Sequence, residues 1–130
     1  MTKKINEDAL KRVIKAIANT DFEKENKTIN ISKLTEKIEQ WAEDRNLHTA
    51  DPNKQMLKLG EEFGELCEGM AKGKSEMVED SIGDMYVVLT ILSMQLGLNI
   101  GKCIQLAYNE IKDRKGKMID GVFVKEEDLK

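Results

Sequence analysis

Turn signals divide the middle of the chain into two helices of similar length. Asp51-Pro52 is a strong helix start, because aspartate caps free backbone N–H groups and proline suits the first helical position. Gly73 and Gly97 each follow a run of apolar residues at helical spacing, and glycine commonly ends a helix. The link between the two runs is a short turn, in which Ser75 is the predicted cap of the second helix. We therefore predict two antiparallel neighbours, over 52–72 and 76–96.

Further elements are predicted on both sides of this hairpin. They are a helix over 7–18 opened by Asn6, a polar loop over 19–30, a helix from the predicted cap Ser32 to about Arg45, a last helix from Asn99 or Gly101 to about Gly116, and a short strand or extended arm over 122–124. These elements predict an all-α, four-helix-bundle-like domain over 31–130. An N-terminal helix-and-loop appendage over 1–30 and a short C-terminal extended arm complete the prediction.

The apolar residues of the hairpin predict which helix faces are buried. On the first helix the expected core face consists of Met56, Leu59, Phe63, Leu66, Cys67 and Met70. From Met85 to Leu98 the second helix is apolar on nearly all sides, and such a helix must be covered all round. In so small a chain a second subunit is the simplest cover, so we expect at least a homodimer.

Composition excludes several classes of protein. The 130 residues include 21 basic and 24 acidic ones, and the net charge of −3 argues against a nucleic-acid partner. The longest apolar run, over 85–98, is shorter than the ~20 residues of a membrane span. The N-terminus lacks a secretory signal, so we expect a cytoplasmic protein without a membrane partner. A single histidine excludes a histidine-rich zinc site.

An acidic cluster spans the predicted hairpin. Residues 61–84 contain eight acidic and two basic residues, a net charge of −6 against −3 for the whole chain. Glu61 and Glu62 lie four and three positions before Glu65, so these carboxylates share one helix face. Asp80 and Asp84 are four positions apart on the following helix. Because the helices are antiparallel neighbours, we expect the two sets of acids to lie at the same level.

Carboxylates crowded between packed helices repel one another and lose water, and a divalent cation would offset both costs. Ligation by oxygen alone suits a hard ion, Mg²⁺ or Mn²⁺, and Mg²⁺ commonly meets substrate phosphates. The alternative is a solvated acidic face, which we favour for Glu68, Glu76 and Glu79. Metal binding is favoured for Glu62, Glu65 and Asp84, because each lies one position from an apolar core residue.

Basic residues near the end of the last predicted helix have two interpretations. Lys112, Arg114 and Lys115 could hold phosphate opposite the acids, or could simply interact with the helix dipole. Trp41 lies on an apolar stripe, where core packing and stacking on a nucleobase both remain open. Asn109 could contact a sugar or base, or only a helix backbone.

These motifs resemble a known family. The segments Glu61-Glu62-Phe63-Gly64-Glu65 and Asp80-Ser81-Ile82-Gly83-Asp84 resemble the EExxE…ExxD signature of the MazG-like, all-α nucleoside triphosphate pyrophosphohydrolases. The resemblance covers roughly residues 34–128, and the sequence segments on either side of the two acidic motifs agree with it. They are Trp41, Gln55-x-x-Lys58, Val87-Val88-Leu89, Asn109-Glu110-Ile111-Lys112-x-Arg114-Lys115-Gly116 and the ending Gly121-Val122-Phe123-Val124-Lys125, the last resembling small phage-type and Gram-positive members.

The resemblance implies a MazG-type fold over 31–130 and a Mg²⁺-dependent enzyme, with Mn²⁺ as a substitute. Such enzymes split a (deoxy)nucleoside triphosphate between the α and β phosphorus, a reaction suited to cleansing the nucleotide pool. Members assemble as dimers or dimers of dimers. The implied catalytic residues are Glu61, Glu62 and Glu65; the metal ligands are Glu62, Glu65, Asp80 and Asp84; the substrate-binding residues are Lys58, Trp41, Asn109, Lys112, Arg114 and Lys115.

One position departs from the family pattern. The glutamate expected three residues before Asp84 is Ser81, and Asp80 is the nearest carboxylate. Asp80 could replace it directly or through water. The departure favours an alternative function, in which the chain is a non-catalytic helical interaction protein that kept the fold and lost the activity.

Overall fold

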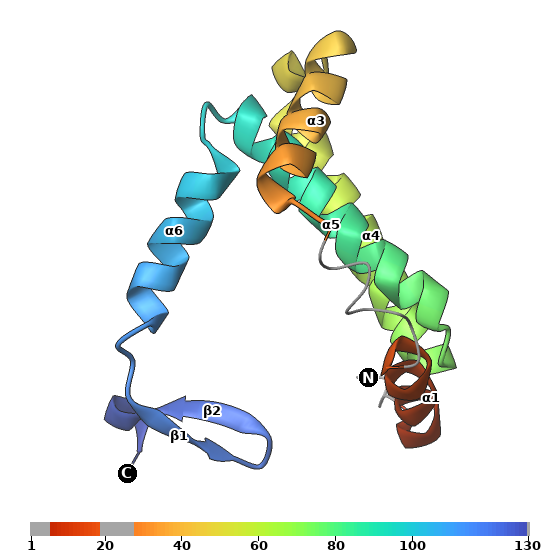
Figure 1. The fold of residues 1–130 in the computed structure, drawn as a ribbon, viewed down its shortest axis with the longest axis vertical. Coiled ribbons are helices and arrows are strands. Elements are labelled where there is room, and N and C mark those ends of the chain that lie inside the picture. The colour runs from red at the N-terminus through yellow and green to blue at the C-terminus, as the bar shows by residue number, and fades with distance from the viewer. Residues whose placement is uncertain (1–5, 19–27, 130) are drawn as a thin grey trace. The chain divides into compact units, whose positions relative to one another are not determined.

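The computed structural model describes residues 6–18 and 28–129, and these residues are mostly helical (Figure 1). The chain divides after Gly97 into two compact units. The first unit holds α1 (Glu7–Ala18), α3 (Ile31–Asp44), the short 3₁₀ helix η1 (Leu47–Thr49), α4 (Pro52–Lys72) and α5 (Ser75–Gln95). The second holds α6 (Ile100–Ile111), β1 (Gly116–Ile119), β2 (Val122–Lys125) and η2 (Glu126–Asp128). The predicted all-α class is confirmed overall, with a short C-terminal β-hairpin, while the MazG-type fold stays a prediction.

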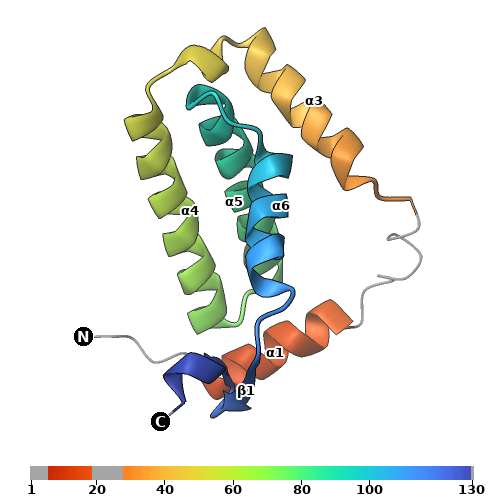
Figure 2. The ribbon, with the colours of Figure 1, turned by 90° about the vertical axis from the view of Figure 1, so that its left-hand side faces the viewer.

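The hairpin of α4 and α5 is the centre of the first unit, as the sequence predicts (Figure 2). The Asp51 side chain accepts a hydrogen bond from the Asn53 backbone N–H at 2.9 Å, and Pro52 is the first helical residue. Gly73 ends α4 with a φ of 68°, a left-handed conformation that glycine adopts without strain. Among the described residues no single helix is long and apolar enough to cross a membrane, and only α5 and α6 taken together as a bent pair have that length and composition.

Two predicted helix caps are wrong. The Asn30 side chain, rather than Ser32, caps α3 by accepting from the Lys33 backbone N–H at 3.0 Å. Asparagine two residues earlier has the same capping ability, and Ser32 is already inside the helix. Ser75 is the first residue of α5, and the capping position is Lys74, whose side chain makes no cap hydrogen bond. The predicted loop over 19–30 lies mostly outside the described residues.

The two helices of the hairpin approach closely near its turn. Gly69 is buried on α4, and a Cβ atom at this position would lie 3.1 Å from Cγ2 of Val78 on α5. Val78, Val88 and Ile91 of α5 are at most 5% exposed and form the core of the unit. Since only a hydrogen atom separates the Gly69 backbone from α5, the local spacing of the helices depends on this glycine.

The other helices of the first unit, α1 and α3, pack against the hairpin. On α1, Ala9 and Val13 are buried where the helix packs against α4 and α5, and a Cβ on Gly73 would lie 3.0 Å from the Ala9 backbone. The predicted division of the chain into an appendage over 1–30 and a domain over 31–130 stays a prediction. On α3, Ala42 is buried and the Thr35 hydroxyl bonds the Tyr86 hydroxyl of α5 at 2.6 Å. Much of the all-round apolar stretch of α5 is therefore covered by its own chain.

The predicted core face of α4 is wrong in part. Met56 and Phe63 are 52% and 56% exposed, whereas Gln55, Glu62 and Gly69 are buried. The apolar arc of α4 is wider than the surface that α5 can cover, so one part of it stays in solvent. Periodicity alone gives the width of this arc and leaves open which part meets the neighbouring helix.

The second unit corrects the predicted C-terminus. The helix α6 begins after the Asn99 cap, as one alternative had it, but ends at Ile111 rather than near Gly116. Gly116 instead begins β1, which pairs antiparallel with β2, with Gly116 opposite Lys125. The arm is thus a β-hairpin, and Asp120 and Gly121 have positive φ values of 50° and 79° at its turn.

Candidate metal centre

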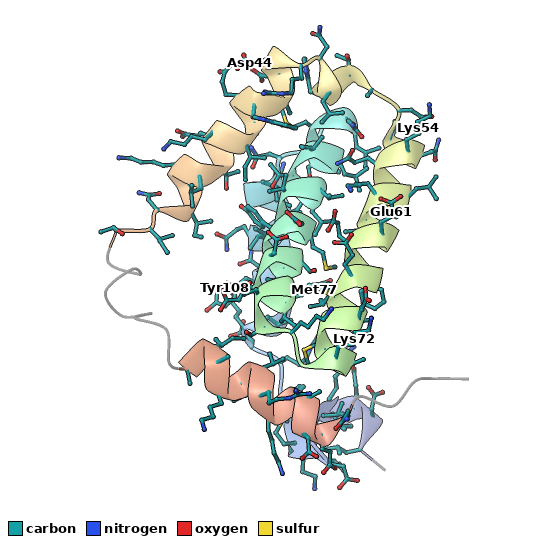
Figure 3. All side chains as sticks on the ribbon, turned by 90° about the vertical axis from the view of Figure 1, so that its right-hand side faces the viewer. Asp44, Lys54, Glu61, Lys72, Met77 and Tyr108 are labelled. Atoms are coloured by element: carbon teal, nitrogen blue, oxygen red, sulfur yellow. The ribbon has the colours of Figure 1, made fainter. Side chains whose placement is uncertain are left out.

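Three carboxylates from the α4–α5 hairpin converge on one point. Glu62 and Glu65 on α4 and Asp84 on α5 each offer an oxygen, and these oxygens lie within 4.8 Å of one another. We call this set the acid triad. Figure 3 labels Glu61, the residue before Glu62, about midway along α4. The predicted meeting of acids from the two helices at one level is therefore what the structure contains.

Glu62 is the buried member of the triad. The residue is 5% exposed, and its Oε1 accepts from the Lys58 ammonium at 3.1 Å. Its Oε2 is also buried, and no described residue donates a hydrogen bond to it. A buried carboxylate oxygen without a donor is costly, and either a proton on Glu65 or Asp84 or a bound cation would relieve this cost.

Glu65 and Asp84, the other two members of the triad, have raised pKa values. Burial first, and then the charges of Asp80 and Glu62, raise the pKa of Asp84. The charge of Glu62, together with desolvation, raises the pKa of Glu65, although Lys58 opposes this shift. In both cases neighbouring negative charges favour the neutral form of the carboxyl group. A bound cation would replace the protons that these carboxylates tend to hold.

The donor set fits a hard divalent ion. All three ligands are carboxylates, and no described histidine or cysteine joins the group. Oxygen ligation of this kind suits Mg²⁺ or Mn²⁺ rather than zinc or copper. A set of three protein ligands would leave positions for water or for the oxygens of a substrate. The residues present therefore fit an ion that is shared with a ligand.

Two further predicted acids lie beside the triad. Glu61 is exposed and its carboxylate lies 3.4 Å from the Lys58 ammonium, outside the triad. Asp80 is exposed, close enough to raise the pKa of Asp84, and lines an acidic surface groove with Glu65. Ser81 is 1% exposed and packs into the core. Asp80 is thus the carboxylate that α5 offers nearest to the position where the family has glutamate.

Some of the predicted substrate-binding residues belong to the first unit and the others to the second. Lys58 binds Glu61 and Glu62 and lines an apolar pocket together with Trp41, which is 46% exposed rather than a core residue. The Arg45 guanidinium lies over the Trp41 ring, 4.2 Å from its centroid. Asn109, Lys112, Arg114 and Lys115 belong to the second unit, where the Asn109 side chain accepts from Gln105 at 3.1 Å. Their predicted role toward phosphate stays a prediction.

Two polar residues of the first unit have no role in the sequence prediction: Gln55, which appears there only as a flank of the acidic motif, and Gln95. Both line the apolar pocket that Lys58 and Trp41 share. Gln55 is 9% exposed, and Gln95 interrupts the long apolar run of α5. A glutamine at a core position was the available signal, because a buried amide must find hydrogen-bond partners.

Comparison with known proteins gives one similar stretch. A protein of Haemophilus phage HP1 (strain HP1c1), described as an uncharacterized 18.2 kDa protein in the rep-hol intergenic region, is 55% identical over 67 residues. The match covers 51% of this chain and 41% of the phage protein, so the chain spans less than half of that relative's length. No family model and no solved structure matches the chain.

Proposed function

We propose that this chain is a Mg²⁺-dependent nucleoside triphosphate pyrophosphohydrolase. The observation that carries the proposal is the buried Oε2 of Glu62, which has no described donor and lies within the acid triad. The resemblance of the two acidic motifs to the MazG-like signature supports the reaction class. A bound Mg²⁺ would neutralise polyphosphate charge and lower the pKa of a water ligand.

The residues of the hairpin have separate roles in this proposal. Glu62, Glu65 and Asp84 would hold the ion, with Asp80 beside them as a direct or water-mediated ligand. Glu61 lies outside the triad, and its exposed carboxylate, which pairs with Lys58 at 3.4 Å, would accept the proton of the attacking water. The water oxygen bonds to the α phosphorus, and the bond from that phosphorus to the bridging oxygen breaks. The products are a nucleoside monophosphate and pyrophosphate.

Lys58 has a different proposed partner in the metal-free protein and in the metal-bound protein. Its ammonium is the counterion of Glu62 in the structure, at 3.1 Å, and its side chain is half exposed. Once an ion satisfies Glu62, this ammonium can turn toward a phosphate oxygen without leaving the carboxylate uncompensated. Lys58 is therefore assigned to substrate binding.

The exposed part of the α4 apolar face supports assembly. Met56, Leu57 and Phe63 are 52%, 72% and 56% exposed on this helix, and a Cβ atom added at Gly60 between them would meet nothing within 4 Å. Exposed apolar groups concentrated on one helix mark an interaction surface. We assign this surface to a second copy of the chain, which gives a homodimer or a homotetramer.

The test is pyrophosphate release from a panel of NTPs and dNTPs with Mg²⁺, Mn²⁺ or EDTA. We expect turnover that EDTA abolishes and that Glu65→Gln reduces at least a hundredfold. Glu79→Gln, an exposed acid of α5 outside the triad, is the matched control and should retain full activity. Turnover that resists EDTA or survives Glu65→Gln would reject the mechanism.

One observation favours the second candidate, a non-catalytic helical interaction protein. Ser81 is buried in the core, so α5 gives the triad one carboxylate where the family pattern has two acids. In that case well-folded protein would take up Mg²⁺ in titration calorimetry and hydrolyse none of the nucleotides.

A further inference from the structure

The first unit contains an apolar pocket of about 430 Å³ beside the acid triad. It lies among the end of α3, η1, the start of α4 and the C-terminal half of α5, and its walls include Trp41, Val87 and Ile91. Lys58 lines the pocket and also contacts Glu62, so the pocket and the triad are adjacent. The volume and the apolar walls are those of a small-molecule site.

Besides the charged residues Asp51, Lys54 and Lys58, two glutamines line this pocket. The amide nitrogen of Gln55 donates to the Val88 carbonyl at 3.3 Å, and that of Gln95 donates to the Leu47 carbonyl at 2.9 Å. Reversing either amide would set two oxygens against each other, so these bonds fix the orientation of both groups. Each amide therefore keeps its oxygen, a hydrogen-bond acceptor, for any further partner.

The side-chain oxygen of Gln95 lacks a hydrogen-bond donor in the described part of the chain. Its Oε1 is buried, and no described residue donates a hydrogen bond to it. A buried acceptor without a donor costs free energy that a ligand N–H can recover. A planar aromatic ligand can pack against the apolar walls of the pocket. N–H groups on the edge of that ligand can donate hydrogen bonds to the glutamine oxygens.

We propose that this pocket receives the base of the nucleotide and selects bases with an exocyclic amino group. This inference rests on the proposed function, because the adjacent triad places the phosphates. The amino groups of adenine, cytosine and guanine donate to Gln95 Oε1, with the Trp41 ring against the base. Uracil and thymine present a carbonyl oxygen where cytosine has its amino group, and that oxygen would face another acceptor.

The test titrates nucleosides, which carry no phosphate, into the metal-free protein with EDTA. Trp41 is the single tryptophan, so its indole N–H gives one cross-peak in a ¹H–¹⁵N spectrum and reports directly on the pocket. Adenosine and cytidine should shift this peak. Purine riboside, which is adenosine without its amino group, and uridine should bind at least about tenfold more weakly, the value expected for one buried hydrogen bond.

Variants separate the hydrogen bond from general packing. Gln95→Met removes the acceptor and should bring the affinity for adenosine down to that for purine riboside. Val87→Phe fills the pocket, keeps the Gln95 bond to Leu47, and should abolish binding of all four nucleosides. Gln40→Met, at an exposed glutamine of α3 that bonds Asp44, is the matched control and should change nothing. Thermal melts by circular dichroism establish that each variant is folded.

The inference is overturned if the four nucleosides bind alike, if none of them shifts the Trp41 signal, or if the preference for adenosine survives Gln95→Met. These results are independent of catalysis, because the titration contains neither metal nor phosphate. Pyrophosphate release without base preference would retain the hydrolase and reject the selective pocket. Selective binding in a protein that hydrolyses no triphosphate would reject the hydrolase and retain the pocket.

Discussion

Replacing Glu62 by glutamine should stabilise the metal-free protein and abolish its response to magnesium. The Glu62 side chain is buried, its Oε2 has no described donor, and two other carboxylates lie within 4.8 Å. Glutamine keeps the shape, removes one of the three crowded charges, and offers N–H donors to Glu65 and Asp84. Loss of the charge also removes the buried carboxylate of the triad.

The expected magnitude follows from the contacts of Glu62. A buried polar atom without a partner costs about 1–3 kcal/mol, and glutamine recovers much of this. The lost ion pair to Lys58 is 3.1 Å long, but the lysine side chain is 52% exposed, so the pair contributes about 1 kcal/mol or less. The difference is a gain of about 1 kcal/mol, or about 3–5 °C in Tm for a chain of this size.

Urea and thermal unfolding followed by circular dichroism, in EDTA and in Mg²⁺, measure this difference. At a Mg²⁺ concentration a hundred times the Kd, the original protein should gain about 2.7 kcal/mol, whereas Glu62→Gln should gain close to none. Glu79→Gln removes a charge outside the triad and should behave like the original protein in both conditions.

Either of two results would refute this reasoning. One is a Glu62→Gln protein that is about 1 kcal/mol less stable than the original in EDTA, which would mean that the carboxylate is well satisfied without metal. The other is a Glu62→Gln protein that keeps the full stabilisation by Mg²⁺, which would place the ion elsewhere.

Four further predictions concern pH, a turn, an exposed helical glycine and assembly. Since burial and then the Asp80 charge raise the pKa of Asp84, the folded state holds this proton more tightly than the unfolded chain does. Metal-free stability should therefore fall as pH rises from the ordinary value of 3.8 through the raised pKa, and Asp84→Asn should flatten that part of the urea-unfolding profile. Gly73→Ala, at a φ of 68° and 3.0 Å from the Ala9 backbone, should cost about 1–2 kcal/mol in urea unfolding. Gly83→Ala, at an exposed position of α5 with nothing within 4 Å, should instead gain about 0.5–1 kcal/mol. Light scattering should show at least a dimer that Phe63→Glu dissociates, and an original protein that is monomeric would contradict the assigned surface.

Elements with a local chemical signal could be predicted from the sequence. The hairpin follows from Asp51-Pro52 at its start and from Gly73 and Gly97, both of which have positive φ in the structure. The acid triad follows from the spacing of its members on two adjacent helices. In each case the information lies within one or two turns of helix, where side chain and backbone interact directly.

Features that depend on distant partners could not be predicted. Phe63 is exposed and Gln55 is buried because α5 covers one part of a wide apolar arc, a choice that the periodicity of α4 does not contain. The β-hairpin was missed for another reason. The Asp120-Gly121 turn is a strong hairpin signal, but the preceding lysines and arginine are equally typical of a helix C-terminus.

The close packing of α4 and α5 at Gly69 bears on the size of the ion that the proposed metal site would hold. This glycine lies seven residues, about 10 Å of helix, from Glu62, and an added Cβ would meet Val78 at 3.1 Å, so that a neighbour must move by a few tenths of an ångström. Bonds from oxygen to Mg²⁺ and to Ca²⁺ differ by a similar amount. In the proposed metal site the spacing of α4 and α5 would therefore bear on the size of the ion that fits, and Gly69→Ala, by pressing the two helices apart, should shift competition between these ions in favour of calcium.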